Sequence, residues 1–123
     1  MNKKKILIVE DEESLLKLES ILLISKGFEV KGAQNGRAAL EAVAEDKPDL
    51  VLLDIMLPEI DGFEVCRQLK SDPATRHIPV IMLTAKKSRE DMVRGEKVGA
   101  DWYITKPFKS AMVIETIQRF LAK

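Results

Sequence analysis

This chain of 123 residues has little cysteine or histidine and no net charge. It contains one cysteine, Cys66, and one histidine, and its 20 lysine and arginine residues balance its 20 acidic residues. A lone cysteine excludes an internal disulfide, and a zero net charge disfavours a nucleic-acid-binding protein, which usually carries a basic surface. No 18-residue apolar run and no amino-terminal apolar signal segment occur. We therefore expect a cytoplasmic protein that neither spans a membrane nor binds nucleic acid directly.

Glycine-rich phosphate-binding loops are also missing. No G-x-G-x-x-G or Walker A pattern occurs, and the first apolar run is followed by acidic residues. This disfavours a flavin or nucleotide cofactor, because its phosphate would need the backbone amides of such a loop. The length is sufficient for one core, since a chain of this size buries about two thirds of its surface on folding. We expect a single domain over residues 1–123.

Short apolar runs alternate with helical patterns along the chain. The runs predict strands, and apolar residues at helical spacing between them predict helices. Gly27 and Gly99 stand where glycine ends a helix, while Asp61 with Glu64 and Ser88 with Asp91 have the spacing of helix amino-terminal caps. The predicted strands cover residues 6–9, 28–31, 50–53, 79–84 and 102–105.

This alternation predicts an α/β fold with a five-stranded parallel sheet covered by helices on both faces. Runs 6–9, 50–53 and 79–84 are apolar throughout, which favours central strands. Run 28–31 alternates apolar with charged residues and run 102–105 is short, so both fit the edges. The pattern matches the doubly wound, flavodoxin-like (βα)5 architecture with strand order 2-1-3-4-5.

Polar residues follow the predicted strands where each one ends. Glu10 and Asp11 come after the first strand, Asp54 follows the third, Thr84 ends the fourth and Lys106 follows the fifth. Ligands of such sheets bind beyond the carboxyl ends of the strands. Carboxylates without histidine or cysteine nearby favour Mg²⁺, and an amine and a hydroxyl can meet phosphoryl oxygens. We expect an aspartate that accepts a phosphoryl group, with Asp54 as the most central candidate.

Four segments together resemble the receiver domain of two-component response regulators. They are ILIVED at 6–11, LLDIMLP at 52–58, IMLTA at 81–85 and YITKPF at 103–108. The resemblance covers essentially the whole chain, and the four motifs occur in order at the right spacings. It implies that Asp54 takes a phosphoryl group from a phosphohistidine of a histidine kinase or a histidine phosphotransfer protein.

The resemblance also implies a set of metal ligands. Asp11, Asp54 and the main-chain carbonyl of Met56 would bind Mg²⁺ directly, and Glu10 would act largely through water. Glu10 stands where many receivers have aspartate, and the longer acid is a common variant at this position.

Further residues take roles in the reaction and the switch by the same resemblance. Lys106 would pair with the phosphoryl oxygens, next to a cis Lys106–Pro107 bond. Thr84 and Tyr103 would form a switch pair that changes the surface of the fourth helix, fifth strand and fifth helix. On phosphorylation, this surface would bind a downstream protein target or a second copy of the chain in a homodimer. The domain would accept and slowly hydrolyse an aspartyl phosphate without being a metabolic enzyme.

Two other functions compete with this interpretation. A haloacid-dehalogenase-type phosphatase also uses an aspartate after a parallel strand with Mg²⁺, but its D-x-D motif is missing at Asp54-Ile55-Met56 and the chain has no room for a cap domain. A phosphorylation-independent adaptor would not need the intact Asp11, Asp54, Thr84 and Lys106.

Three other residues have less specific interpretations. Cys66 shares a helical face with apolar residues, which predicts a buried, inert thiol. We place His77 in a surface loop, and we favour edge packing over partner contact for Trp102.

Overall fold

A computed structural model describes residues 3–84, 89–105 and 109–122. Within these ranges, strands and helices alternate along the chain. They are β1 (Lys5–Val9), α1 (Glu13–Ser25), β2 (Glu29–Ala33), α2 (Gly36–Glu45), β3 (Leu50–Asp54), α3 (Gly62–Ser71), β4 (Val80–Thr84), α4 (Arg89–Lys97), β5 (Trp102–Thr105) and α5 (Ser110–Leu121).

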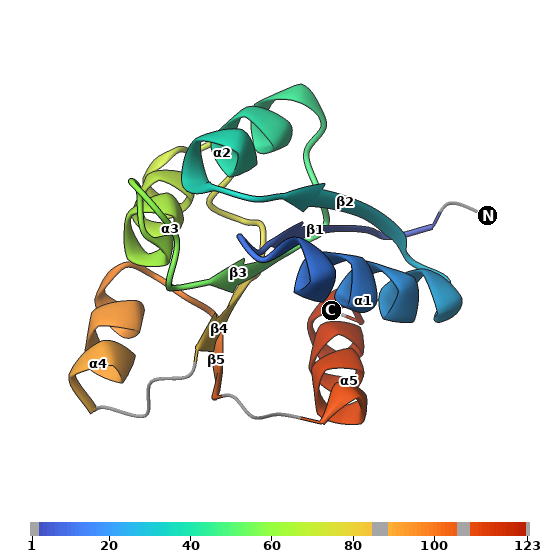
Figure 1. Ribbon diagram of the computed structural model, residues 1–123. Helices are drawn as coiled ribbons and strands as arrows, with labels where there is room; N and C mark the ends of the chain where they lie inside the picture. Colours follow the sequence, from blue (N-terminus) through green and yellow to red (C-terminus); the bar gives the residue numbers. More distant parts are fainter. Residues whose placement is uncertain (1–2, 85–88, 106–108, 123) are drawn as a thin grey trace.

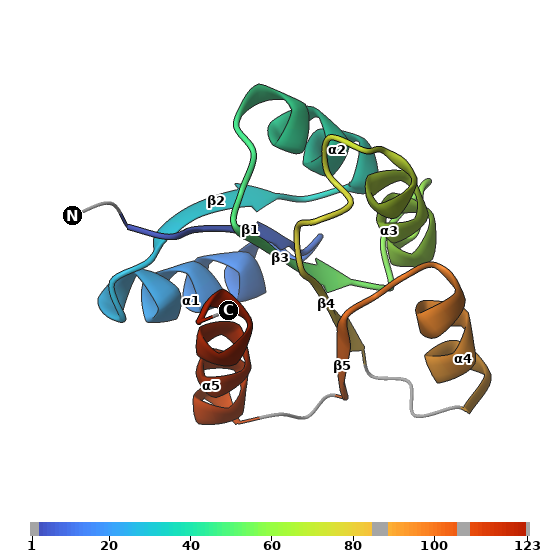
Figure 2. The same ribbon diagram turned by 180° about the vertical axis from the view of Figure 1, so that it is seen from behind.

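The five strands form one parallel sheet in the order β2-β1-β3-β4-β5. Helices α1 and α5 cover one face, and α2, α3 and α4 cover the other (Figures 1 and 2). The flavodoxin-like order predicted from the sequence is confirmed. From β1 the chain first adds β2 on one side and then β3 on the other, so the strand order reverses direction between β1 and β3. In this fold, ligands bind beyond the carboxyl ends of the two strands at such a reversal.

Side chains of the central strands alternate between two apolar cores. In β1, Ile6 and Ile8 join the core under α1 and α5, whereas Leu7 and Val9 join the core under α2 and α3. β3 and β4 divide their side chains in the same way, so all three strands are buried on both faces. This explains why their sequences are apolar throughout instead of alternating.

The edge strands differ as expected from their composition. In β2, Glu29, Lys31 and Gly32 are exposed, and β5 is the shortest strand among the described residues. The structure extends the second predicted strand to Ala33 and starts α2 at Gly36. The reason is local, because the Asn35 side chain accepts a hydrogen bond from the Ala38 amide at 2.8 Å and caps the helix there.

Both glycines expected to end helices do so in the left-handed region. Gly27 has a φ of 94° and Gly99 a φ of 90°. After α1, the Phe28 amide donates to the Leu23 carbonyl and the Gly27 amide donates to the Ile24 carbonyl, which is the Schellman pattern. Asp61 caps α3 as predicted, with its Oδ1 atom 3.0 Å from the Glu64 nitrogen. Ser88 lies outside the described residues.

The expectations for Cys66 and His77 are confirmed. Cys66 is fully buried in α3, and burial raises the pKa of its thiol to about 12, so it stays protonated at neutral pH. His77 is exposed in the segment between α3 and β4. In the part of the chain that the structure describes, no helix has both the length and the apolar character that crossing a membrane requires.

Candidate functional site

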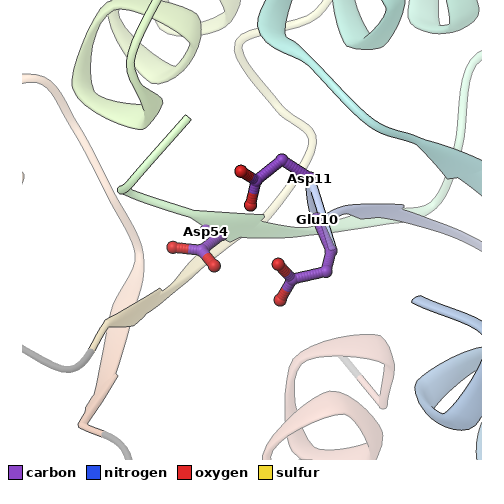
Figure 3. A group of neighbouring side chains, drawn as sticks. All are labelled: Glu10, Asp11 and Asp54. Carbon is purple, nitrogen blue, oxygen red and sulfur yellow. The ribbon is translucent and has the colours of Figure 1, made fainter. Parts of the chain in front are cut away.

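Three carboxylates meet at the carboxyl edge of the sheet. Val9 of β1 pairs with Leu53 of β3, so the residues that follow each of them are neighbours. Carboxylate oxygens of Glu10, Asp11 and Asp54 all lie within 4.8 Å of one another. Figure 3 shows the three side chains gathered where β1 and β3 end. The predicted convergence of these acids from two distant parts of the sequence is confirmed.

The carboxylates differ in their exposure to solvent. Glu10 is 3% exposed and Asp54 is 5% exposed, whereas Asp11 is exposed. The Met56 amide donates a hydrogen bond to Oδ1 of Asp54 at 2.9 Å, and the Glu12 amide donates to Oε2 of Glu10 at 3.3 Å. Backbone amides therefore orient the two buried carboxylates, and the exposed one leaves the cluster open to solvent.

The donor set fits a hard divalent cation. Three negative charges at this separation repel one another, and a bound cation would compensate for that repulsion. The cluster offers oxygen atoms only, which Mg²⁺ and Ca²⁺ prefer over nitrogen and sulfur. Its open side suits Mg²⁺ in particular, because this ion keeps several water ligands when bound by one or two carboxylates.

The segment between β3 and α3 is packed tightly onto the backbone of Asp54. The Gly62 amide donates to the Ile55 carbonyl at 3.0 Å. A Cβ atom at Gly62 would lie 2.5 Å from the Asp54 carbonyl oxygen, so any larger residue would push the segment away. Within this segment, Glu59 has a φ of 63°, which is costly for a residue with a side chain. Sequence reasoning missed the role of Gly62, although the Asp61-Gly62 pair was a visible signal.

Several predicted site residues cannot be placed with the acidic cluster. The side chain of Thr84 and the whole of Lys106 and Pro107 lie outside the described residues. The backbone of Thr84 pairs with Thr105, so β4 and β5 end side by side. The roles predicted for Thr84 and Lys106 therefore stay predictions, as does the Met56 carbonyl as a metal ligand.

The two aromatic residues of β5 face opposite sides of the sheet. Tyr103 is half-buried against the core under α2 and α3, and it lines a groove of about 320 Å³ between α4 and β5. The Trp102 ring lies 6.2 Å from the Phe120 ring and is 46% exposed. The contact with Phe120 supports edge packing, and the switch role of Tyr103 stays a prediction.

The sequence profile of the response regulator receiver domain matches residues 6–118. The chain belongs to this family. Members of this family are signalling modules of two-component systems and not metabolic enzymes, so the phosphatase alternative is set aside.

Named relatives agree with this assignment. The receiver domain is 43% identical to the response regulator PleD of Caulobacter vibrioides, over 93% of this chain and 25% of PleD. The chemotaxis protein CheY4 of Vibrio cholerae has a TM-score of 0.92 and 31% identity, with 97% of this chain and 99% of CheY4 covered.

A third relative was solved with a metal ion. The receiver domain of the sensor histidine kinase PA1611 from Pseudomonas aeruginosa, with magnesium coordinated in the active site cleft, has a TM-score of 0.91 and 29% identity. The alignment covers 99% of this chain and all of that domain. The present chain spans between a quarter and about half of the length of the curated relatives it matches.

Proposed function

We propose that this receiver domain accepts a phosphoryl group on Asp54 as one step of a two-component phosphorelay. The observation that carries the proposal is the Asp54 carboxylate at the carboxyl end of β3, within 4.8 Å of the carboxylates of Glu10 and Asp11. A carboxylate oxygen of Asp54 forms the new bond to phosphorus, and the bond from phosphorus to the donor's imidazole nitrogen breaks. The nitrogen keeps the electron pair, and the ring needs one proton, which it either already carries on its other nitrogen or takes from solvent. The donor thereby returns to neutral histidine.

Mg²⁺ is the cofactor in this proposal. Asp11, Asp54 and the carbonyl of Met56 would hold it, with Glu10 acting through water, and the magnesium in the cleft of the PA1611 receiver domain supports this choice. When bound, the ion supplies charge neutralisation between the carboxylates and the phosphoryl oxygens. The chain itself orients Asp54 through the Met56 amide and shields its carboxylate from bulk water by burial.

Two further side chains complete the proposed chemistry. Lys106 follows directly after β5, and its ammonium group would pair with phosphoryl oxygens. The hydroxyl of Thr84 would donate a hydrogen bond to the same group, and Tyr103 would then turn inward and change the surface of α4, β5 and α5. The side-by-side ends of β4 and β5 support this placement of Thr84 and Lys106 at one edge.

The proposed partners follow from the family. A histidine kinase or a histidine phosphotransfer protein donates the phosphoryl group, and a downstream protein binds the changed surface, either to one chain or to a phosphorylation-dependent homodimer. We propose that residues 1–123 form one receiver domain that acts in the cytoplasm, with no direct contact to nucleic acid or membrane, and that it hydrolyses its own aspartyl phosphate slowly.

The test is incubation with Mg²⁺ and acetyl phosphate, followed by intact mass measurement. The wild type should gain the mass of one phosphoryl group, and Asp54→Asn should gain none. Asp72→Asn is the matched control, because this exposed aspartate lies at the other end of α3 and asparagine can keep its hydrogen bond from the Ala74 amide. A wild type without the added mass would leave a phosphorylation-independent adaptor as the function, and an unchanged gain in Asp54→Asn would exclude Asp54 as the acceptor.

A further inference from the structure

Arg94 of α4 contacts the first turn of α3 in two ways. Its guanidinium carbon lies 4.3 Å from the centre of the Phe63 ring, a cation–π geometry. Its Nη2 atom lies 3.6 Å from Oδ2 of Asp61, an ion pair that is longer than a hydrogen bond. Asp61 uses its other oxygen, Oδ1, to cap α3. One side chain of α4 therefore contacts both the cap and the first turn of α3.

The turn that Arg94 contacts is fixed to the backbone of the proposed phosphoacceptor. Phe63 is 3% exposed and belongs to the core that also contains Ile55 and Leu57. Gly62, between Asp61 and Phe63, packs so closely on the Asp54 carbonyl that no side chain fits there. The start of α3 cannot move far from β3 without losing this packing, so it is a rigid support for Arg94.

The other end of α4 connects to the same edge of the sheet. Its first residue in the structure, Arg89, follows the end of β4 at Thr84 by a short segment of chain. A rearrangement around Thr84 would therefore act on the amino-terminal end of α4. Arg94 lies five residues further along the helix, more than one turn, where its contacts resist displacement of α4 from α3.

We propose that Arg94 is a positioning residue that holds α4 against α3 while Asp54 is an unmodified carboxylate and thereby opposes the switch to the phosphorylated arrangement. The proposal rests on the function proposed above and adds to it a residue that sets how easily the switch occurs. By linkage, a contact that favours the unmodified arrangement weakens the response to a phosphoryl group by the same factor.

The expected effect is modest because the contact is exposed. The Arg94 side chain is 58% exposed and the Asp61 side chain 41% exposed. Exposed ion pairs and exposed cation–π contacts each contribute little, and together they correspond to a shift of about fivefold in an equilibrium constant.

The test uses beryllium fluoride, a phosphoryl analogue, in the presence of Mg²⁺. Its half-saturating concentration can be followed through the fluorescence of Trp102, the only tryptophan of the chain, which lies in β5. Arg94→Met keeps the apolar stem and loses the charge, and it should lower the half-saturating concentration about fivefold. Arg94→Lys keeps a cation and should stay closer to the wild type.

Two further variants separate this role from a general structural one. Asp61→Asn retains the cap but loses the ion pair, so it should shift the response in the same direction as Arg94→Met. The double variant, Arg94→Met with Asp61→Asn, should shift the half-saturating concentration no further than Arg94→Met alone. The two effects should not add, because Arg94→Met already removes the ion pair that Asp61→Asn removes. Arg67→Met is the matched control, because the Arg67 guanidinium binds Glu64 of its own helix.

The outcomes are distinct. If the wild type responds and Arg94→Met has an unchanged or higher half-saturating concentration, the role of Arg94 is overturned while the proposed function stands. A lower free energy of unfolding in urea for Arg94→Met, with an unchanged half-saturating concentration, also overturns this role, because it would show that Arg94 only stabilises the fold. A wild type that neither binds beryllium fluoride nor accepts a phosphoryl group overturns the proposed function and the role of Arg94 with it.

Discussion

The two edges of the sheet treat charge in opposite ways. At the amino edge, where strands begin, opposite charges are paired: Lys5 Nζ lies 2.8 Å from Asp46, and Lys70 Nζ lies 2.8 Å from Asp101. At the carboxyl edge, Glu10, Asp11 and Asp54 bring three like charges within 4.8 Å. Pairing lowers the free energy of the folded chain, whereas clustering raises it unless a cation binds. The amino edge therefore contributes to stability, whereas the charges at the carboxyl edge fit a bound cation.

The Lys70 ammonium group shows how closely the amino edge is assembled. It donates to the Ile78 carbonyl at 2.8 Å and the Arg76 carbonyl at 3.1 Å in addition to its ion pair with Asp101. Asp101 also accepts a hydrogen bond from the Val80 amide at 2.8 Å. One lysine thus joins the end of α3 to the starts of β4 and β5.

The largest expected effect comes from breaking this pairing. Lys70→Met removes an ammonium group whose side chain is only 15% exposed, so the Arg76 and Ile78 carbonyls lose a hydrogen-bond donor and Asp101 loses its cation. Together these losses should lower the free energy of unfolding by about 3 kcal/mol. Urea denaturation measures it, and Lys17→Met, an exposed lysine of α1, is the control. Phosphorylation from acetyl phosphate should be preserved in Lys70→Met under conditions where it is folded. A variant as stable as the control would contradict the contrast between the edges.

The opposite response is expected at the carboxyl edge. Asp11→Asn removes one of three like charges and should raise the free energy of unfolding of the metal-free protein by about 1 kcal/mol. Mg²⁺ at a hundred times its dissociation constant from the wild type should raise the free energy of unfolding of the wild type by about 2.7 kcal/mol. In Asp11→Asn most of this increase should be absent. Thermal melts with EDTA and with Mg²⁺ measure both changes. A destabilised metal-free Asp11→Asn would show that the acids do not repel one another.

Backbone strain adds a smaller cost at the carboxyl edge. Glu59 adopts a φ of 63° in the segment after Asp54. Glu59→Gly removes this steric cost, but the greater freedom of glycine in the unfolded chain offsets part of the benefit. The free energy of unfolding should therefore rise by about 0.5 kcal/mol. Urea denaturation measures it. Glu41→Gly, in the interior of α2, should instead destabilise the protein, and a loss in both variants would refute the strain at Glu59.

The smallest effect concerns a paired acid near the carboxyl edge. Hydrogen bonds from Arg67 and Gln68 lower the pKa of Glu64 to about 2. Because the unfolded chain binds this proton more readily, the contribution of Glu64 is present above its ordinary pKa of 4.5 and is lost as the pH falls toward 2. Glu64→Gln should therefore show a shallower fall of Tm over this range. An identical pH profile in both proteins would mean that Glu64 titrates normally.

Most of the fold could be predicted from local sequence patterns. Runs such as 50–53 are apolar because both faces of their strand are buried, and Gly27 and Gly99 end helices because glycine adopts a positive φ readily. The capping by Asp61 followed from its spacing to Glu64. Strand order came from comparing the apolar character of the runs, which reports burial on one face or on two.

The details of the site were harder to predict. The Met56 amide on Asp54, the packing of Gly62 on the Asp54 carbonyl and the contact of Arg94 with Phe63 each depend on the path of the segment after β3. None of them has a periodic signal, since they join residues through one irregular segment or between two helices. The pairing of Lys70 with Asp101 is equally invisible in sequence, because 31 positions separate the two residues.

The sequence by itself determined the alternation of strands and helices, the acids at the strand ends and the motifs that identify a receiver domain. These properties are local, because burial and backbone preference act on each residue and its near neighbours. Only the tertiary structure decided how far apart the three carboxylates lie, which of them are buried and what supports the segment beside Asp54. Distances between residues remote in sequence depend on how the helices and strands pack, and that packing is a property of the whole chain.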